Sequence, residues 1–422
     1  GALEVHPRGL EYVAGRLRAL GKLQALRGRG GGEGLDYLRA YAADVKQYQR
    51  LETLQDFFWR LECLTVASQQ VGLRDPTPLD LSAFGALRHL EVRDADVSSA
   101  APRGLGRLRA SLETLAVHNS AEAIGHVLGV ADGDWEVDGL RGEDAGGRAV
   151  GVAVGGGVRS GAGGYGGGTR GVGGGGGGAG RARVWTRLER ISFRGNQLYS
   201  LDASLSNAPA VRILDLSRNQ LDGAAVGFLP VAAGPGTGPR QPLGECLGAL
   251  EVLDLGSNRI AGLEELCAGL AECRQLRRLI LADNAIACTA GLEALAGLEA
   301  LDLSGNLLGH LGEAQRLARL PWLGELWLRD NPLCGGGRAG ATVAYRTAVV
   351  GYFRERAGGA AFELDGSPGS PSELAQALGR GGALARGLRL LPKSLRPTKS
   401  GASAADAAVE AAAAVPAAAA AA

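Results

Sequence analysis

One apolar pattern recurs along this chain with a fixed internal spacing. It has the form L-x-x-L-x-L-x-x-N-x-L, where x is any residue and other apolar side chains can replace leucine. Six copies follow it closely, and their asparagines are Asn196, Asn219, Asn258, Asn284, Asn306 and Asn331. Three weaker copies precede them, with Gln69, Ala95 and Ser120 at the asparagine position. Most intervals are about 22 to 26 residues, which indicates a stack of repeated units.

The spacing of the pattern has a physical cause. The alternating L-x-L predicts a short strand whose apolar face points inward. The chain must then turn away, and a buried asparagine can satisfy backbone groups that the turn leaves unpaired. Stacked copies bury one another's leucines and form a parallel sheet. We therefore expect an α/β repeat solenoid in which the residues between the pattern leucines point outward on a concave face.

The remaining segments are predicted from composition and periodicity. A glycine-rich run cannot bury enough apolar surface to fold, so we expect disorder there. Terminal repeats would expose their leucines, so we expect a cap at each end of the stack. The predicted order is a helical N-terminal cap at 1–60, degenerate repeats at 61–130, a disordered glycine-rich insertion at 131–184, clear repeats at 185–333, a C-terminal cap at 334–378 and a disordered tail at 379–422.

Composition excludes several classes of protein. The 45 lysines and arginines nearly cancel the 44 aspartates and glutamates, so no global field favours nucleic acid or anionic membrane. No apolar run reaches the roughly 20 residues of a membrane-spanning helix. The six cysteines form no Cys-x-x-Cys or paired Cys/His spacing, which predicts no metal site and suits a reducing compartment. Because the chain starts at Gly1 and contains no methionine, a removed signal peptide stays open.

Catalytic and cofactor motifs are missing from the sequence. The glycine-rich run is not followed by Gly-Lys-Ser/Thr, so it does not predict a phosphate loop. The five histidines form no His-Glu-x-x-His pair, and there is no nucleophile elbow. We therefore expect a non-enzyme without a cofactor or a small-molecule substrate. The arginines and Tyr165 of the insertion leave an RNA-associated role open, although a plain linker is the favoured interpretation.

Candidate partner-binding residues lie at the outward strand positions. Aspartate occupies the same position in three copies, but Leu-Asp-Leu-Ser is a common way to fill such a repeat. Trp327 is the sharper candidate because an exposed tryptophan often anchors an interface, although it could instead pack against the C-terminal cap. The predicted partner-binding residues are Arg194, Asp215, Ser217, Asp254, Asp302, Trp327 and Arg329.

The chain resembles the intracellular leucine-rich-repeat family. Asn331-Pro332-Leu333, followed by Tyr345-Arg346 and the segment 364–366, is similar to the C-terminal cap of that family, and the lone Cys334 differs from the disulfide-rich cap of secreted repeat proteins. The order of segments from about 10 to 370 is also similar to a group of kinase-interacting adaptors. This resemblance implies a cytoplasmic signalling scaffold that binds a serine/threonine kinase and influences where it resides.

Two departures and two alternatives accompany this resemblance. The glycine-rich insertion is not typical of the family, whose proteins continue well beyond the repeats, whereas this chain ends in polyalanine. No residue specifies a kinase over a phosphatase. A phosphatase-regulator-like or axonemal dynein light-chain-like repeat module therefore remains an alternative, as does an RNA-associated protein.

Overall fold

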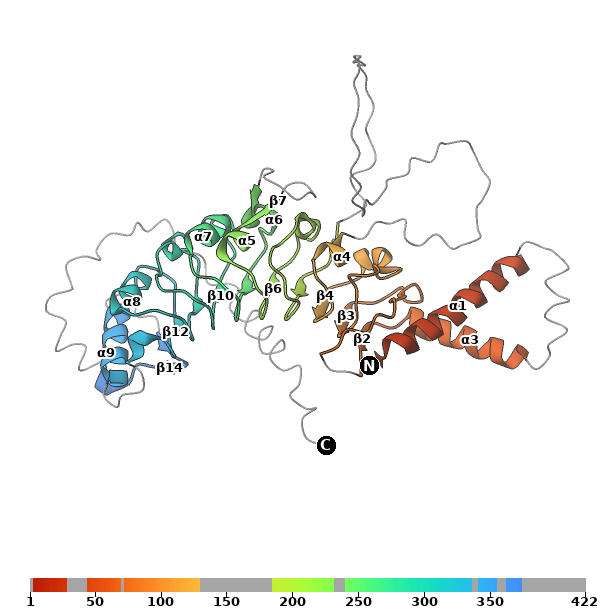
Figure 1. Cartoon of the computed structure of the whole chain (residues 1–422), viewed down its shortest axis with the longest axis horizontal. Coiled ribbons are helices and arrows are strands. Elements are labelled where there is room, and N and C mark those ends of the chain that lie inside the picture. Colours follow the sequence, from red (N-terminus) through yellow and green to blue (C-terminus); the bar gives the residue numbers. More distant parts are fainter. Residues whose placement is uncertain are drawn as a thin grey trace, which may run out of the picture. The chain divides into compact units, whose positions relative to one another are not determined.

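A computed structural model describes most of the 422-residue chain. The described residues are 3–28, 44–69, 72–129, 184–230, 240–335, 341–354 and 362–373, all of which belong to the compact unit Gly1–Ala377 (Figure 1). The predicted insertion lies outside the described residues except for Val184, and the predicted tail at 379–422 lies entirely outside them.

A parallel sheet runs through the described part of the chain. It has 12 strands in the order β1-β2-β3-β4-β5-β6-β9-β10-β11-β12-β13-β14, and only the last pair is antiparallel. The strands are β1 (Leu3–Val5), β2 (Cys63–Ala67), β3 (His89–Arg93), β4 (Thr114–His118), β5 (Arg190–Ser192), β6 (Ile213–Asp215), β9 (Val252–Asp254), β10 (Arg278–Ile280), β11 (Ala300–Asp302), β12 (Glu325–Trp327), β13 (Glu363–Leu364) and β14 (Ser367–Pro368). Each copy of the pattern contributes one strand, which confirms the predicted α/β repeat fold.

Helices and 3-10 turns of varied length return the chain from one strand to the next. Figure 1 shows α5, α7 and α8 on the side of the stack opposite the strands. The helices are α1 (Pro7–Gly28), α3 (Asp44–Trp59), α4 (Gly125–Leu128), α5 (Gly223–Gly227), α6 (Leu243–Cys246), α7 (Glu264–Leu270), α8 (Leu311–Leu317) and α9 (Ala341–Arg354), with 3-10 turns at Leu105–Ala110, Ala203–Asn207, Leu292–Ala294 and Pro332–Cys334. Strands β7 (Phe228–Pro230) and β8 (Arg240–Pro242) form a separate antiparallel pair.

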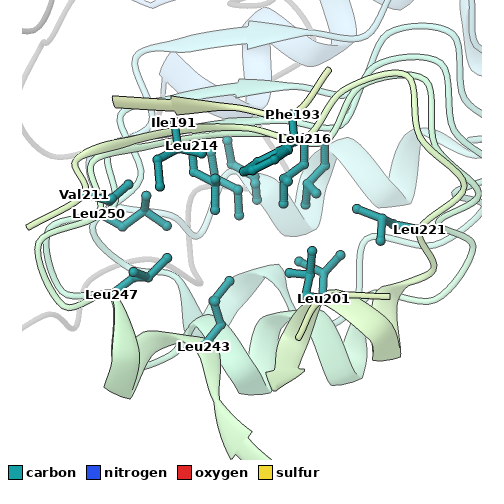
Figure 2. Packing of buried hydrophobic residues seen from close by; sticks show 14 of the residues in the cluster. Ile191, Phe193, Leu201, Val211, Leu214, Leu216, Leu221, Leu243, Leu247 and Leu250 are labelled. Atoms are coloured by element: carbon teal, nitrogen blue, oxygen red, sulfur yellow. The ribbon is translucent and has the colours of Figure 1, made fainter. Parts of the chain in front are cut away.

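The pattern leucines form the core between the strands and the returning segments. Ile191 and Leu214 are adjacent in the sheet register, and both are buried. Figure 2 shows them projecting toward the layer that holds Leu243 and Leu247. Each fully buried aliphatic side chain of this kind stabilises the fold by about 1.5–3 kcal/mol. These side chains belong to one hydrophobic core that continues from each repeat to the next.

The asparagines form a ladder that links consecutive turns. Asn219 Oδ1 accepts hydrogen bonds from the backbone N–H groups of Asn196 and Leu198, both at 3.0 Å. Its Nδ2 donates to the carbonyl oxygens of Phe193 at 2.9 Å and Leu216 at 2.8 Å. Asn258, Asn284, Asn306 and Asn331 repeat this arrangement. The prediction that these side chains satisfy turn backbone is confirmed.

Degenerate positions of the ladder use other groups. Ser120 stands at one asparagine position and is fully buried, and its hydroxyl oxygen accepts from the Ala95 N–H at 3.1 Å. Gln69 stands at another and is exposed. Ser120 therefore accepts a backbone hydrogen bond as a ladder asparagine does, with a smaller side chain. In the first copy, the exposed Gln69 does not take a buried ladder position.

Asp365 closes the C-terminal end of the repeat stack. One carboxylate oxygen of Asp365 accepts from the Leu328 and Arg329 N–H groups at 2.8 and 3.0 Å. In the preceding repeat the equivalent N–H group, that of Leu303, donates to the Trp327 carbonyl oxygen of the next strand, so the Asp365 carboxylate takes the place of a strand carbonyl. The other oxygen accepts the Tyr345 hydroxyl at 2.6 Å, and Arg346 donates to the Leu364 carbonyl oxygen at 2.9 Å. Burial raises the pKa of Tyr345, and the charge of Asp365 adds to this, so the phenol keeps its proton and stays a donor.

Candidate partner-binding face

Outward side chains of the sheet form three columns between β5 and β12, which we call the sheet face. Register partners on neighbouring strands define the first and second columns. The third column consists of the residues two positions after those of the second. The first column is Arg190, Ile213, Val252, Arg278, Ala300 and Glu325. The second is Ser192, Asp215, Asp254, Ile280, Asp302 and Trp327, and the third is Arg194, Ser217, Gly256, Ala282, Ser304 and Arg329. All seven predicted site residues therefore belong to the second and third columns.

The three aspartates are not equally spaced across that surface. Asp215 and Asp254 are direct register partners on β6 and β9, whereas Ile280 separates Asp254 from Asp302. Oδ1 of Asp302 accepts from the Ser304 N–H at 2.9 Å and from its hydroxyl at 2.6 Å. Asp254 Oδ1 accepts from the Gly256 N–H at 2.8 Å. One oxygen of each carboxylate thus closes the end of its own strand.

Ser217 corrects one expectation. We expected the third-column residues to be exposed, but Ser217 retains only 6% of its accessible surface. Its N–H and hydroxyl donate to Asp215 Oδ1 at 2.9 and 2.6 Å. These hydrogen bonds hold the Ser217 side chain against the turn. Ser217 therefore fixes the Asp215 carboxylate and does not face solvent. Arg194 and Arg329 in the same column are exposed as expected.

Asp254 has the most perturbed carboxyl group of the sheet face. Burial raises its pKa to about 6, and the charges of Asp215 and Asp302 add to the increase. The hydrogen bond from Gly256 and the positive charge of Arg194 act in the opposite direction without compensating fully. Ionising Asp254 therefore has a free-energy cost, which arises first from burial and then from the neighbouring carboxylates.

Trp327 is half-buried beside a charged pair that sequence reasoning missed. Arg278 donates to Glu325 at 3.1 Å, and its guanidinium lies 6.0 Å from the centre of the Trp327 ring. Ala300 stands between Arg278 and Glu325 in the first column, and its small side chain lets the arginine reach across. The missed signal is the first outward position of each strand, since the prediction considered only the second and third.

The adjoining strands carry charges that are already paired. Glu91 accepts from Arg93 at 2.6 Å and lies 3.7 Å from the His118 ring nitrogen Nε2. Burial lowers the pKa of His118, although Glu91 and Asp215 act against that shift. Imidazole at this position is therefore held largely neutral near pH 7.

The described residues show neither a metal-binding cluster nor a membrane-spanning helix. Within the described ranges, no group of three or more His, Cys, Asp or Glu side chains is arranged to hold a metal ion. The helices of those same ranges are all too short or too polar to span a bilayer. All six cysteines carry free thiols.

Comparison with curated proteins identifies distant relatives, and no family model matches the chain. Serine/threonine-protein kinase 11-interacting protein of Gallus gallus is 30% identical over 193 residues, 46% of this chain and 16% of that protein. The Homo sapiens protein of the same name is 28% identical over 339 residues, 80% of this chain and 24% of that protein. Human leucine-rich repeat-containing protein 56 is 32% identical over 133 residues, 32% of this chain and 22% of that protein. The chain thus spans a quarter or less of these relatives.

Two solved structures illustrate the partial similarity to known folds. The Drosophila melanogaster SNF/U2A' complex gives a TM-score of 0.25 at 20% identity, covering 36% of this chain and 75% of the other. Internalin C2 of Listeria monocytogenes gives 0.24 at 24% identity, covering 35% and 64%. The strand order, the asparagine ladder and the curated relatives together show that this chain has the leucine-rich-repeat fold and is distantly homologous to serine/threonine-protein kinase 11-interacting protein.

Proposed function

We propose that the chain is a non-enzymatic adaptor that binds another protein on the sheet face. The observation that carries this proposal is the separation of roles along each strand. The pattern leucines are buried, while Arg194, Asp254, Trp327 and Arg329 remain on one rigid surface that the fold does not need for its core. Rigid aromatic and charged side chains on an open sheet are suited to recognising a protein surface.

A non-catalytic role is supported by how the polar groups are used. The Ser192 hydroxyl donates to Asp215 at 2.8 Å, whereas a hydrolytic serine would donate to a histidine base. The carboxylates of Asp215 and Asp302 each bind the N–H and hydroxyl of a serine on their own turn. These contacts fix charges in place for recognition, and they do not activate a nucleophile.

The proposed partner is a serine/threonine kinase, and the proposed compartment is the cytoplasm. Support for the kinase comes from the two relatives whose names state an interaction with serine/threonine kinase 11. Support for the compartment comes from the six free thiols, which suit a reducing environment. We further propose that binding influences where the kinase resides.

Titration of the full chain with purified serine/threonine kinase 11 tests this function. The informative variant combines Trp327→Ala with Arg329→Ala, which removes an aromatic contact and an exposed guanidinium. We expect a loss of about 2–4 kcal/mol of binding free energy, typical of paired interface anchors. The matched control is Arg274→Ala, an arginine whose side chain is 84% exposed beyond α7. Circular dichroism would confirm that both variants fold. Absence of kinase binding, or equal binding by both variants, would refute the proposal.

A further inference from the structure

We propose that the sheet face binds a basic segment of its partner, with a lysine or arginine side chain lying over Ile280 between Asp254 and Asp302. The inference rests on the proposed function, because it assigns the chemistry of the partner at the same face. The occupant is an extended or helical protein segment that carries a cation flanked by apolar side chains.

The register sets the spacing that this side chain requires. Asp254, Ile280 and Asp302 are consecutive members of the second column, on β9, β10 and β11. Adjacent strands lie about 4.8 Å apart, so the two aspartates stand roughly 10 Å apart with Ile280 midway. A cation above Ile280 can approach both carboxylates, whereas the carboxylates are too far apart for one small ion to bind both directly.

Apolar residues lie on both sides of this position, and Arg278 precedes Ile280 on the same face of β10. Val252 and Ala300 of the first column are buried, and Ile280 and Ala282 are half-buried. Lysine and arginine side chains lay their methylene stems along apolar surface and keep their charged ends among polar groups. A floor of small aliphatic residues between two carboxylates matches that amphipathic shape, and it does not match a purely ionic ligand.

Both carboxylates are held in place before any partner arrives. Oδ1 of Asp254 accepts from Gly256, and Oδ1 of Asp302 accepts from Ser304, so neither side chain rotates freely. The second oxygen of each is thereby directed away from the turn. Preorganised acceptors bind a cation without the entropic cost of ordering them.

The charge balance around β9 favours an incoming cation. Asp215, Asp254 and Asp302 lie within four neighbouring strands, and Arg194 is the cation that acts on Asp254. Arg278 lies on β10, but its guanidinium forms an ion pair with Glu325 and lies near the Trp327 ring. Two neighbouring carboxylates, Asp215 and Asp302, act on Asp254 against one guanidinium, that of Arg194, so the negative charge is undercompensated. A cationic side chain of the partner would supply the missing charge.

Binding of labelled model peptides to the full chain tests this inference. The probe is a fluorescein-labelled peptide of three Leu-Lys-Leu-Gly-Ser units, compared with counterparts in which glutamine or glutamate replaces lysine. In fluorescence anisotropy we expect the lysine peptide to bind at least about ten-fold more tightly than the glutamine peptide. The glutamate peptide should bind more weakly than either. Equal binding of the lysine and glutamate peptides would overturn the proposal.

Two charge-matched double variants locate the site. Asp254→Asn with Asp302→Asn keeps the oxygen that closes each turn and removes two charges, and it should weaken lysine-peptide binding about ten-fold. Glu264→Gln with Glu272→Gln removes two exposed charges at α7, and it should leave binding within about two-fold. Equal losses in both pairs would show nonspecific attraction and overturn the inference.

The kinase titration separates this inference from the proposed function. If kinase binding is lost in the Trp327 and Arg329 variant but neither kinase nor lysine peptide responds to the aspartate variant, the function stands and the inference fails. If the lysine peptide binds as expected while the kinase does not bind, the inference stands and the kinase assignment fails.

Discussion

Single asparagine side chains hold consecutive turns of the repeat stack together. Asn306 is 3% exposed, accepts from the Ile286 N–H at 3.0 Å and donates to the Leu281 and Leu303 carbonyl oxygens at 2.9 and 3.0 Å. Removing such a side chain leaves buried backbone groups on two repeats without partners. The cost therefore arises at the interface between repeats and not within one of them.

Asn306→Ala should lower the free energy of unfolding by about 1–3 kcal/mol, the cost of leaving buried backbone groups unpaired. Urea denaturation followed by circular dichroism measures this change. The control is Gln69→Ala at an exposed ladder position, where we expect a change within about 0.5 kcal/mol. Similar losses in the two variants would contradict a specific structural role of the asparagine.

The carboxyl group of Asp254 makes stability depend on pH. Its pKa of about 6 in the folded chain lies above the ordinary value of 3.8, mainly because of burial and the charges of Asp215 and Asp302. The folded state therefore holds this proton more tightly than the unfolded state does. Its contribution is favourable at low pH and is lost as pH rises through about 6.

Asp254→Asn removes this titration and keeps the acceptor for Gly256. At pH 7.5 we expect the variant to be more stable than the parent by about 1–2 kcal/mol, and at pH 4 we expect the two to be nearly equal. Urea denaturation at both pH values measures the difference, and Glu264→Gln reports the effect of net charge alone. An equal gain in the free energy of unfolding at both pH values would contradict this explanation.

At the scale of elements, α5 and α7 make a backbone contact that glycine alone permits. A methyl group at Gly269 would overlap the carbonyl oxygen of Gly227. Gly269→Ala should therefore separate the two helices and lower the free energy of unfolding by about 1–3 kcal/mol. Gly312→Ala in α8 is the matched control, since no atom lies within 4 Å of the added group.

Alanine is the better helix former, so Gly312→Ala should be neutral or stabilising by up to about 1 kcal/mol. Thermal unfolding of the two variants gives the comparison directly. If Gly269→Ala lowered thermal stability no more than the control does, the close packing of α5 on α7 would be contradicted.

Strands were predictable from sequence, whereas this helix contact was not. The L-x-L spacing fixes which residues enter the core, so the pattern located strands such as β6, β9 and β11. Contacts such as Gly227 with Gly269 depend on the segments between pattern leucines, where composition varies from one copy to the next. The β7–β8 pair arises in such a segment, and the pattern gives no indication of it.

The strand positions of the candidate site residues were predictable from sequence, but the contacts that their side chains make were not. The repeat pattern alone places Asp215, Asp254 and Trp327 at one strand position, and the register aligns them in one column. It did not predict the burial of Ser217, which depends on a hydrogen bond to its own turn. Nor did it predict Arg278 beside Trp327, because that contact depends on an alanine on the intervening strand.

On the scale of the whole chain, the repeat stack is continuous on both sides of the predicted insertion. Strands β4 and β5 pair in parallel, with Leu115 opposite Ile191. The Trp185 indole N–H donates to the Leu128 carbonyl oxygen at 3.3 Å, so the segments before and after the insertion touch. Asn196 Oδ1 also accepts from the Ser120 N–H at 2.7 Å, across a separation of 76 residues in sequence.

Replacing residues 131–183 with a short Gly/Ser linker should therefore leave the fold intact. Loop-closure entropy changes slowly with length, so we expect the free energy of unfolding to change by less than about 1 kcal/mol. Differential scanning calorimetry of the shortened and full chains measures this, and hydrogen exchange at Leu115 and Ile191 reports the β4–β5 pairing. Asn196→Ala in the shortened chain is the positive control, since it removes a side chain that joins the two sides. A cooperative loss of several kcal/mol on shortening, or rapid exchange at β4 and β5 alone, would mean that the insertion itself holds the two halves of the stack together.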